Sequence, residues 1–386
     1  MKFVRAFAMM CLVLPTLFAQ ADDTSKPTAQ YSEFESSVLK KANAFVDEPI
    51  RTVMDKTELP PSGDKHDHYG LSPYHWPNPN TPDGLPYIMK DGEVNPEANT
   101  DAYDRQSYFR MGDAVEYCTL AWQITLDPKY AKKAVAVMRA WFIDSATRMN
   151  PNLNYAQVSK GNNLGSQTGI IRGMTILELV RCVAVLKTSG EWSESNDTAW
   201  RAWLADFAKW LAESPLGIAE SKAANNHGTW YDVQVSTFAF EGGNIELARK
   251  VLSEAGEKRI AKQVKASGEQ TFELLRTKSW DYSVMNLDAM IQLAMLGKRV
   301  DVDLWNFTGE KGGNIRAALD YLIPFATGEK AWDKKQIKDF NPAILYPLLR
   351  RAASEFPNAP YAAALTKFDP KASKVGLDHL KYPVLP

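Results

Sequence analysis

The sequence has few cysteines, almost no net charge and no long apolar run beyond its first residues. It contains 386 residues, of which three are Cys, and its formal net charge is −1 at pH 7. Nucleic-acid-binding proteins usually carry a basic surface, so this charge balance argues against that class. A polyanionic ligand would need a local group of basic side chains instead. No later stretch reaches the roughly 18 apolar residues of a transmembrane helix, so we expect no membrane-spanning segment.

The N-terminal residues have the composition of a secretory signal. Lys2 and Arg5 precede an apolar stretch that ends in Ala19–Ala21, a small-x-small cleavage site. We therefore expect residues 1–21 to be removed. Residues 22–386 are expected to form a single exported domain, periplasmic or secreted, that has no contact with a membrane after signal cleavage.

Two cysteines, Cys118 and Cys182, remain after that cleavage. They could pair as one disulfide in an oxidising compartment or stay as two buried thiols, and the sequence leaves both open. Residues 64–69 alternate His and Asp, which is a possible metal-ligand pattern. The segment has no helix to fix ligand geometry, so we expect no metal and no cofactor.

Helical periodicity dominates from residue 101 onward, and strand-like alternation of useful length is absent. Asp101, Asp127 and Asn244 are each predicted to cap a helix. Trp200 and Trp203 follow helical spacing and are predicted to be core residues. Further predicted helices cover residues 32–46, 170–186, 281–297, 312–323, 340–354 and 358–367.

Residues 62–96 form a Pro-rich segment that also contains Tyr74, Trp76 and Tyr87. Long loops inside compact domains are typically lids or binding loops, and the prolines stiffen this one. A linker between domains is the alternative, although a linker has little need for so many aromatic side chains. We expect a lid or a substrate-binding loop.

The stretch 223–234 places several polar groups at a predicted helix start. Asn225 and Asn226 are poor residues for a helix interior but good ones for its first turn. His227 and Tyr231 are four residues apart and share a helix face. A helix start presents free N–H groups and the positive end of the helix dipole, which suits an anion. Taken alone, these residues also fit an Asn-capped helix with a structural histidine.

A second stretch, residues 273–287, contains Arg276 and Tyr282 six positions apart. Taken with residues 223–234, it resembles the alginate-lyase-domain polysaccharide lyases. In that family an Asn-His pair at a helix start and a downstream Arg and Tyr form one site. The other segments similar to this family are residues 71–79, 82–87 and 150–157.

This resemblance implies an all-α fold, an (α/α) toroid or incomplete barrel of helical hairpins with the long Pro- and aromatic-rich loop over its cleft. It implies β-elimination on an acidic polysaccharide, alginate or a related polyuronate such as glucuronan. By the same resemblance, Asn226, His227 and Arg276 neutralise the substrate carboxylate, and Tyr282 acts as base and acid. His227 could instead be the base for one epimer. Arg276 would supply the positive charge that Tyr282 needs in order to ionise.

Weaker candidates for substrate binding accompany this set. They are Tyr74, Trp76, Arg105, Tyr155, Gln157, Gln167 and Tyr231. Two other functions stay open, a glycoside hydrolase on the same toroid and a non-catalytic glycan-binding protein. A hydrolase needs two carboxylates that flank one bond, and Glu178 and Asp288 show no such pairing. The sequence decides neither the preferred uronate nor the oligomeric state.

Overall fold

The computed structural model describes residues 29–368, and the predicted signal peptide lies outside the described residues. The α-helices are α1 (Ala29–Asp47), α2 (Arg105–Thr125), α3 (Pro128–Phe142), α4 (Met174–Leu186), α5 (Glu194–Glu213), α6 (Pro215–Glu220), α7 (Asn226–Gly242), α8 (Ile245–Ala255), α9 (Ala261–Gln263), α10 (Thr271–Leu274), α11 (Ser279–Gly297), α12 (Ile315–Ala326), α13 (Tyr346–Glu355) and α14 (Tyr361–Leu365). The strands are β1 (Tyr69–Leu71), β2 (His75–Trp76), β3 (Ile88–Met89) and β4 (Tyr155–Val158). The other helical segments are η1 (Val53–Asp55), η2 (Pro96–Asn99), η3 (Gln167–Gly173), η4 (Gly256–Ile260), η5 (Lys298–Val300) and η6 (Pro342–Leu345).

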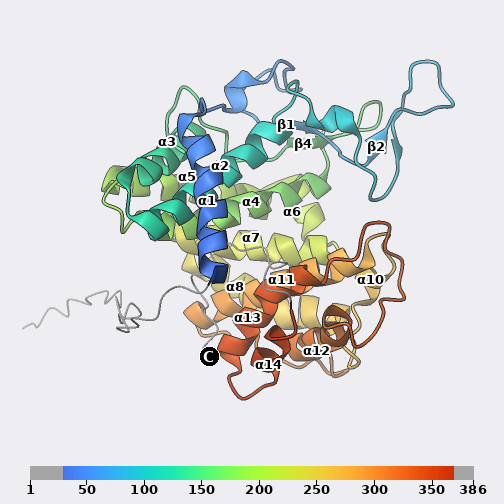
Figure 1. Ribbon diagram of the computed structural model, residues 1–386. Helices are drawn as coiled ribbons and strands as arrows, with labels where there is room; N and C mark the ends of the chain where they lie inside the picture. The colour runs from blue at the N-terminus through green and yellow to red at the C-terminus, as the bar shows by residue number, and fades with distance from the viewer. Residues whose placement is uncertain (1–28, 369–386) are drawn as a thin grey trace, which may run out of the picture.

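Helix α7 lies at the centre of the molecule. It packs against α4 and α5 on one side and against α8 and α11 on the other, and Figure 1 shows it between the α1–α6 half and the α8–α14 half. Most of its side chains are buried, polar ones such as Asp232 and Gln234 included. A helix surrounded by protein on all sides has no solvent face, which explains its weak amphipathic pattern. The packed helices form an all-α fold, an (α/α) toroid, as predicted.

The helix boundaries agree with most of the sequence-based predictions. Asp127 accepts a hydrogen bond from the first turn of α3, and Asn244 does the same for α8, so both predicted caps are confirmed. The cap predicted at Asp101 is wrong. Helix α2 begins one turn later, with Asp104 at its N-cap, because the exposed Asp101 side chain pairs with Arg51 instead. The six further predicted helices each overlap an observed helix.

The tryptophans of α5 belong to the core, as predicted. Trp200 and Trp203 are 2% and 4% exposed, and their rings stack with centroids 5.9 Å apart. Phe142 of α3 meets both rings edge-on. Stacked and edge-on aromatic pairs add to the stabilisation that burial alone gives, so this cluster joins α3 to α5.

The structure contains short strands that the sequence pattern does not reveal. β1 pairs in parallel with β4, and β2 pairs antiparallel with β3. Each strand has only two to four residues, which is too short for alternation to stand out. The predicted loop of residues 62–96 is therefore partly ordered as a β2–β3 hairpin, which extends from the body of the molecule in Figure 1.

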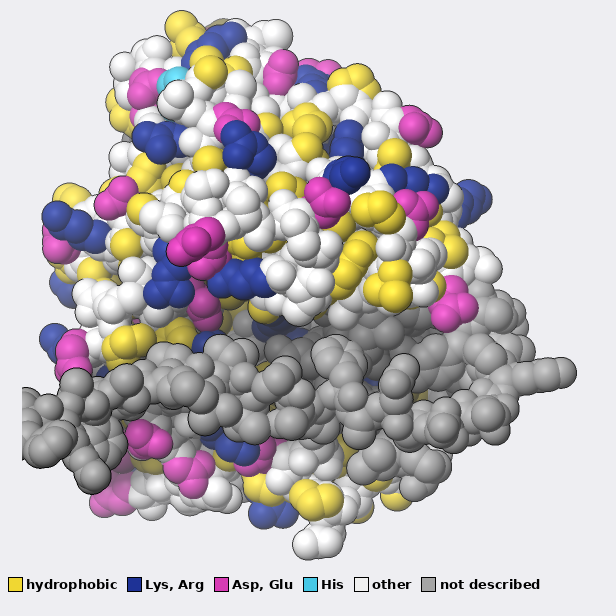
Figure 2. Space-filling model, turned by 90° about the vertical axis from the view of Figure 1, so that its left-hand side faces the viewer, with side chains coloured by type: hydrophobic (Ala, Val, Ile, Leu, Met, Phe, Trp, Pro, Cys, Tyr) yellow, Lys and Arg dark blue, Asp and Glu magenta, His cyan; other side chains and the backbone are white. Residues whose placement is uncertain are grey.

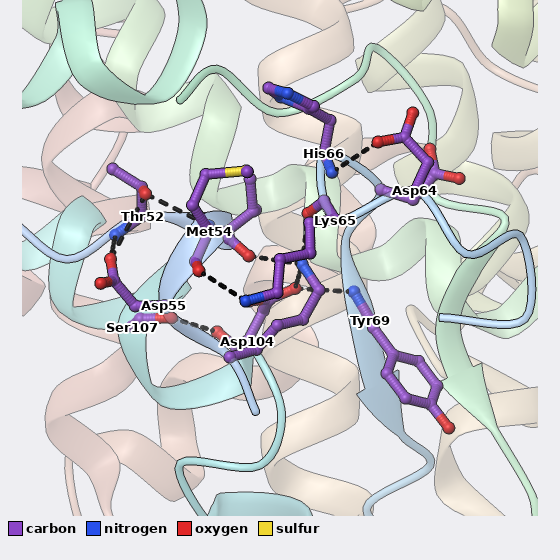
Figure 3. A network of polar contacts seen from close by, with 12 residues as sticks. Thr52, Met54, Asp55, Asp64, Lys65, His66, Tyr69, Asp104 and Ser107 are labelled. Atoms are coloured by element: carbon purple, nitrogen blue, oxygen red, sulfur yellow. Dashed lines mark hydrogen bonds and ion pairs between the residues drawn. The ribbon is translucent and has the colours of Figure 1, made fainter. Parts of the chain in front are cut away.

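A buried ion pair fixes the segment that leads into this hairpin. The Lys56 and Asp104 side chains are fully buried, with Nζ 3.0 Å from Oδ2. The Lys56 ammonium also donates to the carbonyls of Val53 and Lys65, both at 2.6 Å, and the Tyr69 N–H donates to Asp104 at 2.8 Å. We call Val53, Lys56, Lys65, Tyr69 and Asp104 the scaffold cluster. Figure 3 shows the polar contacts of this region, with Lys65, Tyr69 and Asp104 labelled. Burial raises the pKa of Asp104 to about 6 and lowers the pKa of Lys56.

The open question about the cysteines is settled by their positions. Cys118 of α2 and Cys182 of α4 are both buried free thiols, and burial raises the pKa of each. Both sit in the packing between helices, so they act as small apolar residues rather than as a disulfide.

The His- and Asp-rich run of residues 64–69 is built into the scaffold. Asp67 accepts hydrogen bonds from Asn150 and Asn152, and the fully buried His68 ring meets Tyr108 edge-on. Across residues 29–368, no group of three or more His, Cys, Asp or Glu side chains could hold a metal ion.

No helix among residues 29–368 has the length and apolar character needed to cross a membrane. On the face in Figure 2, basic and acidic side chains are interspersed, which fits the small net charge.

Candidate active site

The predicted helix start at the Asn pair is confirmed. The Asn225 side chain caps α7 by accepting a hydrogen bond from the His227 N–H at 3.2 Å. Asn226 is the first residue of the helix, and it is 1% exposed. The sequence folds this way because Asn offers a side-chain oxygen to a helix N–H that has no partner within the helix.

The first turn of α7 already holds an anion from the protein itself. The Glu273 carboxylate of α10 accepts the Asn226 backbone N–H at 2.6 Å and its side-chain Nδ2–H at 2.7 Å. Glu273 is 1% exposed, and burial raises its pKa although the two bonds from Asn226 act in the opposite direction. A carboxylate only accepts hydrogen bonds, so it fixes which way the Asn226 amide faces. The Asn226 Oδ1 is buried and has no hydrogen-bond partner among the described residues.

A second buried acid holds the histidine. The Glu220 Oε1 atom, at the end of α6, lies 2.6 Å from the His227 Nδ1 atom. The Glu220 side chain is 2% exposed, whereas the His227 side chain is 21% exposed. One edge of the imidazole is therefore held inside the protein while part of the ring stays accessible.

Arg276 lies in an ion pair with the hairpin segment. Its Nη2 donates to Asp91 Oδ1 at 2.8 Å, its Nε donates to Asp91 Oδ2 at 3.4 Å, and the neighbouring Thr277 hydroxyl donates to the same carboxylate at 2.9 Å. Both charged side chains are about one quarter exposed, at 22% for Arg276 and 26% for Asp91. The guanidinium can bind a carboxylate through two parallel donors, and here Asp91 occupies both.

Tyr282, in the first turn of α11, joins this arrangement. The Arg276 guanidinium lies over the Tyr282 ring, 4.0 Å from its centroid, and the Tyr282 hydroxyl is 3.3 Å from the Tyr74 hydroxyl. Burial and the Tyr74 contact raise the pKa of Tyr282, although the charge of Arg276 lowers it. The expectation that Arg276 favours ionisation has the right sign, but burial outweighs it while Asp91 compensates the guanidinium.

These contacts connect the four predicted catalytic residues with Tyr74. The Glu273 carboxylate accepts hydrogen bonds from Asn226, and the Glu273 carbonyl accepts one from the Arg276 backbone N–H at 3.1 Å. His227 follows Asn226 in the first turn of α7. We call the connected residues the site cluster. Its members are Tyr74, Asp91, Glu220, Asn226, His227, Glu273, Arg276 and Tyr282. Sequence analysis missed Asp91, Glu220 and Glu273, and no local spacing marks any of them.

Two further candidates lie beside the hairpin. Trp76 is half-buried in β2, where its indole N–H donates to the Glu93 carbonyl at 3.0 Å and Lys90 lies over its ring. Arg105, at the start of α2, contacts the Asn99 side chain, and burial lowers its pKa while Tyr74 raises it.

The remaining candidates make separate contacts. Tyr155 is half-buried in β4, Gln157 accepts a hydrogen bond from Thr168 at 2.9 Å, and Gln167 is exposed at the start of η3. Tyr231 is 6% exposed, and its hydroxyl donates to the Leu211 carbonyl at 2.9 Å. The structure therefore makes Tyr231 a core residue that ties α7 to α5. It does not share the environment of His227, despite the four-residue spacing.

An all-α toroid in which Glu273 links Asn226, at the start of α7, to Arg276, just before α11, has the architecture of a helical polysaccharide lyase. The sequence model of the family named alginate lyase matches residues 52–332, and the chain belongs to this family.

Solved structures agree with this assignment. An alginate lyase from Bacteroides ovatus is 35% identical, with 92% of this chain and 94% of that chain covered and a TM-score of 0.84. Alginate lyase A1-III from Sphingomonas species A1 is 15% identical, with 87% of this chain and 92% of that chain covered and a TM-score of 0.52, so it shares the fold. A search of curated proteins finds no match.

Proposed function

We propose that this protein cleaves alginate by β-elimination and leaves a 4,5-unsaturated uronate at the new chain end. Membership of the alginate lyase family supports this activity. The observation that carries the assignment of the site is the contact between the Arg276 guanidinium and the Tyr282 ring, beside the Asn226–Glu273 pair. Glu273 links the two, because Asn226 donates to its carboxylate and the Arg276 backbone N–H donates to its carbonyl at 3.1 Å.

The reaction places clear demands on a site. A base takes the proton from C5, the C4–C5 double bond forms, the C4–O4 bond breaks, and the departing O4 atom receives a proton. The C5 proton is held firmly while the neighbouring carboxylate keeps its full charge. Donors that point at this carboxylate stabilise the charge that develops on it, and loss of one such donor commonly costs about 3–4 kcal/mol.

The site cluster can meet these demands. Arg276 supplies a permanent positive charge in a planar fork that matches a carboxylate. Asn226 keeps a second amide hydrogen, and the His227 ring is partly accessible. Tyr282 serves as the proton carrier, with its hydroxyl next to that of Tyr74. In this assignment the substrate carboxylate takes the place of Asp91 on Arg276, because the two groups are chemically the same.

The preferred polymer is the finer part of this proposal. Alginate contains two epimeric uronates, and glucuronan offers a third uronate with the same carboxyl group. The alginate lyase A1-III named above has also been solved as a histidine-to-alanine variant in complex with a tetrasaccharide, which is a ligand of that enzyme. We also propose export to the periplasm or the medium after removal of residues 1–21.

The test is incubation of the mature protein with separate polymannuronate, polyguluronate and glucuronan. A lyase produces ultraviolet absorbance from the new double bond conjugated to the carboxylate. New reducing ends without this absorbance would identify a glycoside hydrolase and overturn the proposal. Polysaccharide binding with neither product would identify a non-catalytic binding protein.

A further inference from the structure

Glu220 has no role in the reaction as proposed so far, yet it is buried against one of the proposed catalytic residues. It is the last residue of α6, and it is 1% exposed. Its Oε1 atom lies 2.6 Å from Nδ1 of His227. Within residues 35–368, His227 is its ion-pair partner, and neither Lys nor Arg pairs with it.

Burial of a carboxylate costs free energy, and a gain in stability alone does not explain why Glu220 is buried. A buried acid loses its hydration, and replacement of a buried ion pair by apolar residues is often neutral or stabilising. An acid kept at such a position therefore calls for another explanation. The contact with His227 offers one, because a carboxylate next to imidazole controls where the ring carries its protons.

The chemistry of the two groups fixes the tautomer. An ionised carboxylate has no hydrogen to donate, so the short contact requires a proton on Nδ1. The other ring nitrogen, Nε2, is then the atom left to face a ligand. It carries a lone pair when the ring is neutral and an N–H when the ring is charged.

We infer that Glu220 is a positioning residue that holds His227 with its proton on Nδ1 and presents Nε2 to the substrate. The inference rests on the proposed function for its catalytic meaning. It applies whether His227 neutralises the carboxylate through Nε2–H or accepts the C5 proton at Nε2. In both cases the wrong tautomer would place a hydrogen or a lone pair where the reaction needs the opposite.

The first test needs no substrate. Nitrogen-15 NMR of the imidazole groups distinguishes the two tautomers, and the His227→Ala variant identifies the His227 signals among the five histidines. We expect a protonated Nδ1 with the strongly deshielded hydrogen of a bond to a charged acceptor. An unprotonated Nδ1 in the wild-type protein would overturn the inference. This spectrum stands even if the protein acts on no uronate polymer, so the two proposals can fail separately.

The second test uses three variants. Glu220→Leu removes the acceptor and should lower kcat roughly 10–100-fold, the range found when a metal-bound histidine loses the group that orients it, while KM changes little. Glu220→Gln keeps an acceptor oxygen without the charge and should restore part of the loss. Glu213→Leu, at an exposed position that ends α5, is the matched control and should retain full activity.

Two results would contradict the role of Glu220. One is a folded Glu220→Leu protein with wild-type kcat and an unchanged His227 spectrum. The other is an equal loss of kcat in Glu220→Gln and Glu220→Leu with no change in the ring signals of either variant. If Glu220→Leu does not fold, the Glu220→Gln protein decides. Its Nδ1 hydrogen should move to a less deshielded position, because a neutral acceptor forms the weaker bond.

Discussion

Two ion pairs in this molecule have similar chemistry and opposite surroundings. In the scaffold cluster, the Lys56 and Asp104 side chains are fully buried, and the Lys56 ammonium has three acceptors. In the site cluster, Arg276 and Asp91 keep 22% and 26% of their side-chain surface exposed. The buried pair has partners that only unfolding can remove, whereas a carboxylate from solution can reach the exposed one.

The difference shows how one chain uses the same interaction for two purposes. A buried charge without its partner is strongly unfavourable, so the scaffold pair fixes the chain between η1 and α2. A pair that is about one quarter exposed contributes less to stability, because water screens it. In the function proposed above, the substrate carboxylate therefore replaces Asp91 on Arg276 at small cost to the fold. The following variants test this contrast, from the largest expected effect to the smallest.

Tyr282→Phe should nearly abolish turnover and leave the fold unchanged. The ring keeps its contact with Arg276, 4.0 Å from the guanidinium carbon, but the hydroxyl that carries the proton is gone. Formation of the unsaturated product should be lost while binding of the polymer changes little. Near-normal turnover in a folded variant would remove Tyr282 from the mechanism.

Asp104→Ala should destabilise the fold more than Asp91→Ala does, because it leaves the Lys56 charge buried without a counter-ion. We expect a loss of about 3–5 kcal/mol in the free energy of unfolding. Chemical denaturation followed by circular dichroism measures it. Asp91→Ala is the matched control from the partly exposed pair, and its loss should be within about 1 kcal/mol. Equal losses in the two variants would erase the contrast between the clusters.

Asp104 also gives a prediction about how stability depends on pH. Burial raises the pKa of Asp104 from 3.8 to about 6, so between these pH values the folded protein binds more protons than the unfolded chain. The contribution of Asp104 to stability therefore falls as the pH rises through this window. Replacing Asp104 by Asn should remove that slope from a plot of unfolding free energy against pH. A slope that persists unchanged in the variant would assign it to other groups.

Glu273→Gln should lower kcat roughly tenfold to a hundredfold, because a hydrogen bond to a charged group contributes about 1.5–3 kcal/mol. The Gln amide can offer only one acceptor oxygen to the two N–H groups of Asn226, so the amide loses its fixed orientation. Steady-state kinetics on one defined polymer measures the change. Glu310→Gln, at an exposed position, should match the wild type. An unchanged kcat in Glu273→Gln would mean that α7 orients Asn226 without help.

Asp91→Asn should produce the smallest effect, a KM lower by roughly twofold to tenfold, since the internal competitor for Arg276 is weakened by about 0.4–1.4 kcal/mol. The charge of Asp91 also raises the pKa of Tyr282, so its removal should move the rising limb of the pH–rate profile, where Tyr282 ionises to act as base, to lower pH. Glu93→Gln in the same segment is exposed and should change neither quantity. A higher KM in Asp91→Asn would show that Asp91 organises Arg276 rather than competes for it.

Local sequence features predicted the parts of the molecule that depend on neighbouring residues. The start of α7 follows from the preference of Asn for helix caps, and the Trp200–Trp203 core follows from helical spacing. The cap at Asp101 was predicted wrongly, because the Asp101 side chain pairs with Arg51, which is 50 positions away in sequence.

The partners of the catalytic candidates could not be predicted in this way. Glu273 is 47 positions from Asn226, and Asp91 is 185 positions from Arg276. Spacing on one helix carries no information about contacts of this kind. Only the packing of α6, α10 and the hairpin against α7 and α11 brings these acids to the site.

The distances along the chain have a consequence for how activity arises during folding. The hydroxyl groups of Tyr74 and Tyr282, 3.3 Å apart in space, are separated by 208 positions in sequence. Contacts between such distant segments close a large loop. They form late in folding, because closing the loop reduces the conformational entropy of the chain. A chain still emerging from the ribosome lacks α10 and α11 until nearly three quarters of it has been made. Catalysis therefore begins only when the segments of Tyr74 and Tyr282 have met, and turnover reports that these two distant parts of the fold are in place.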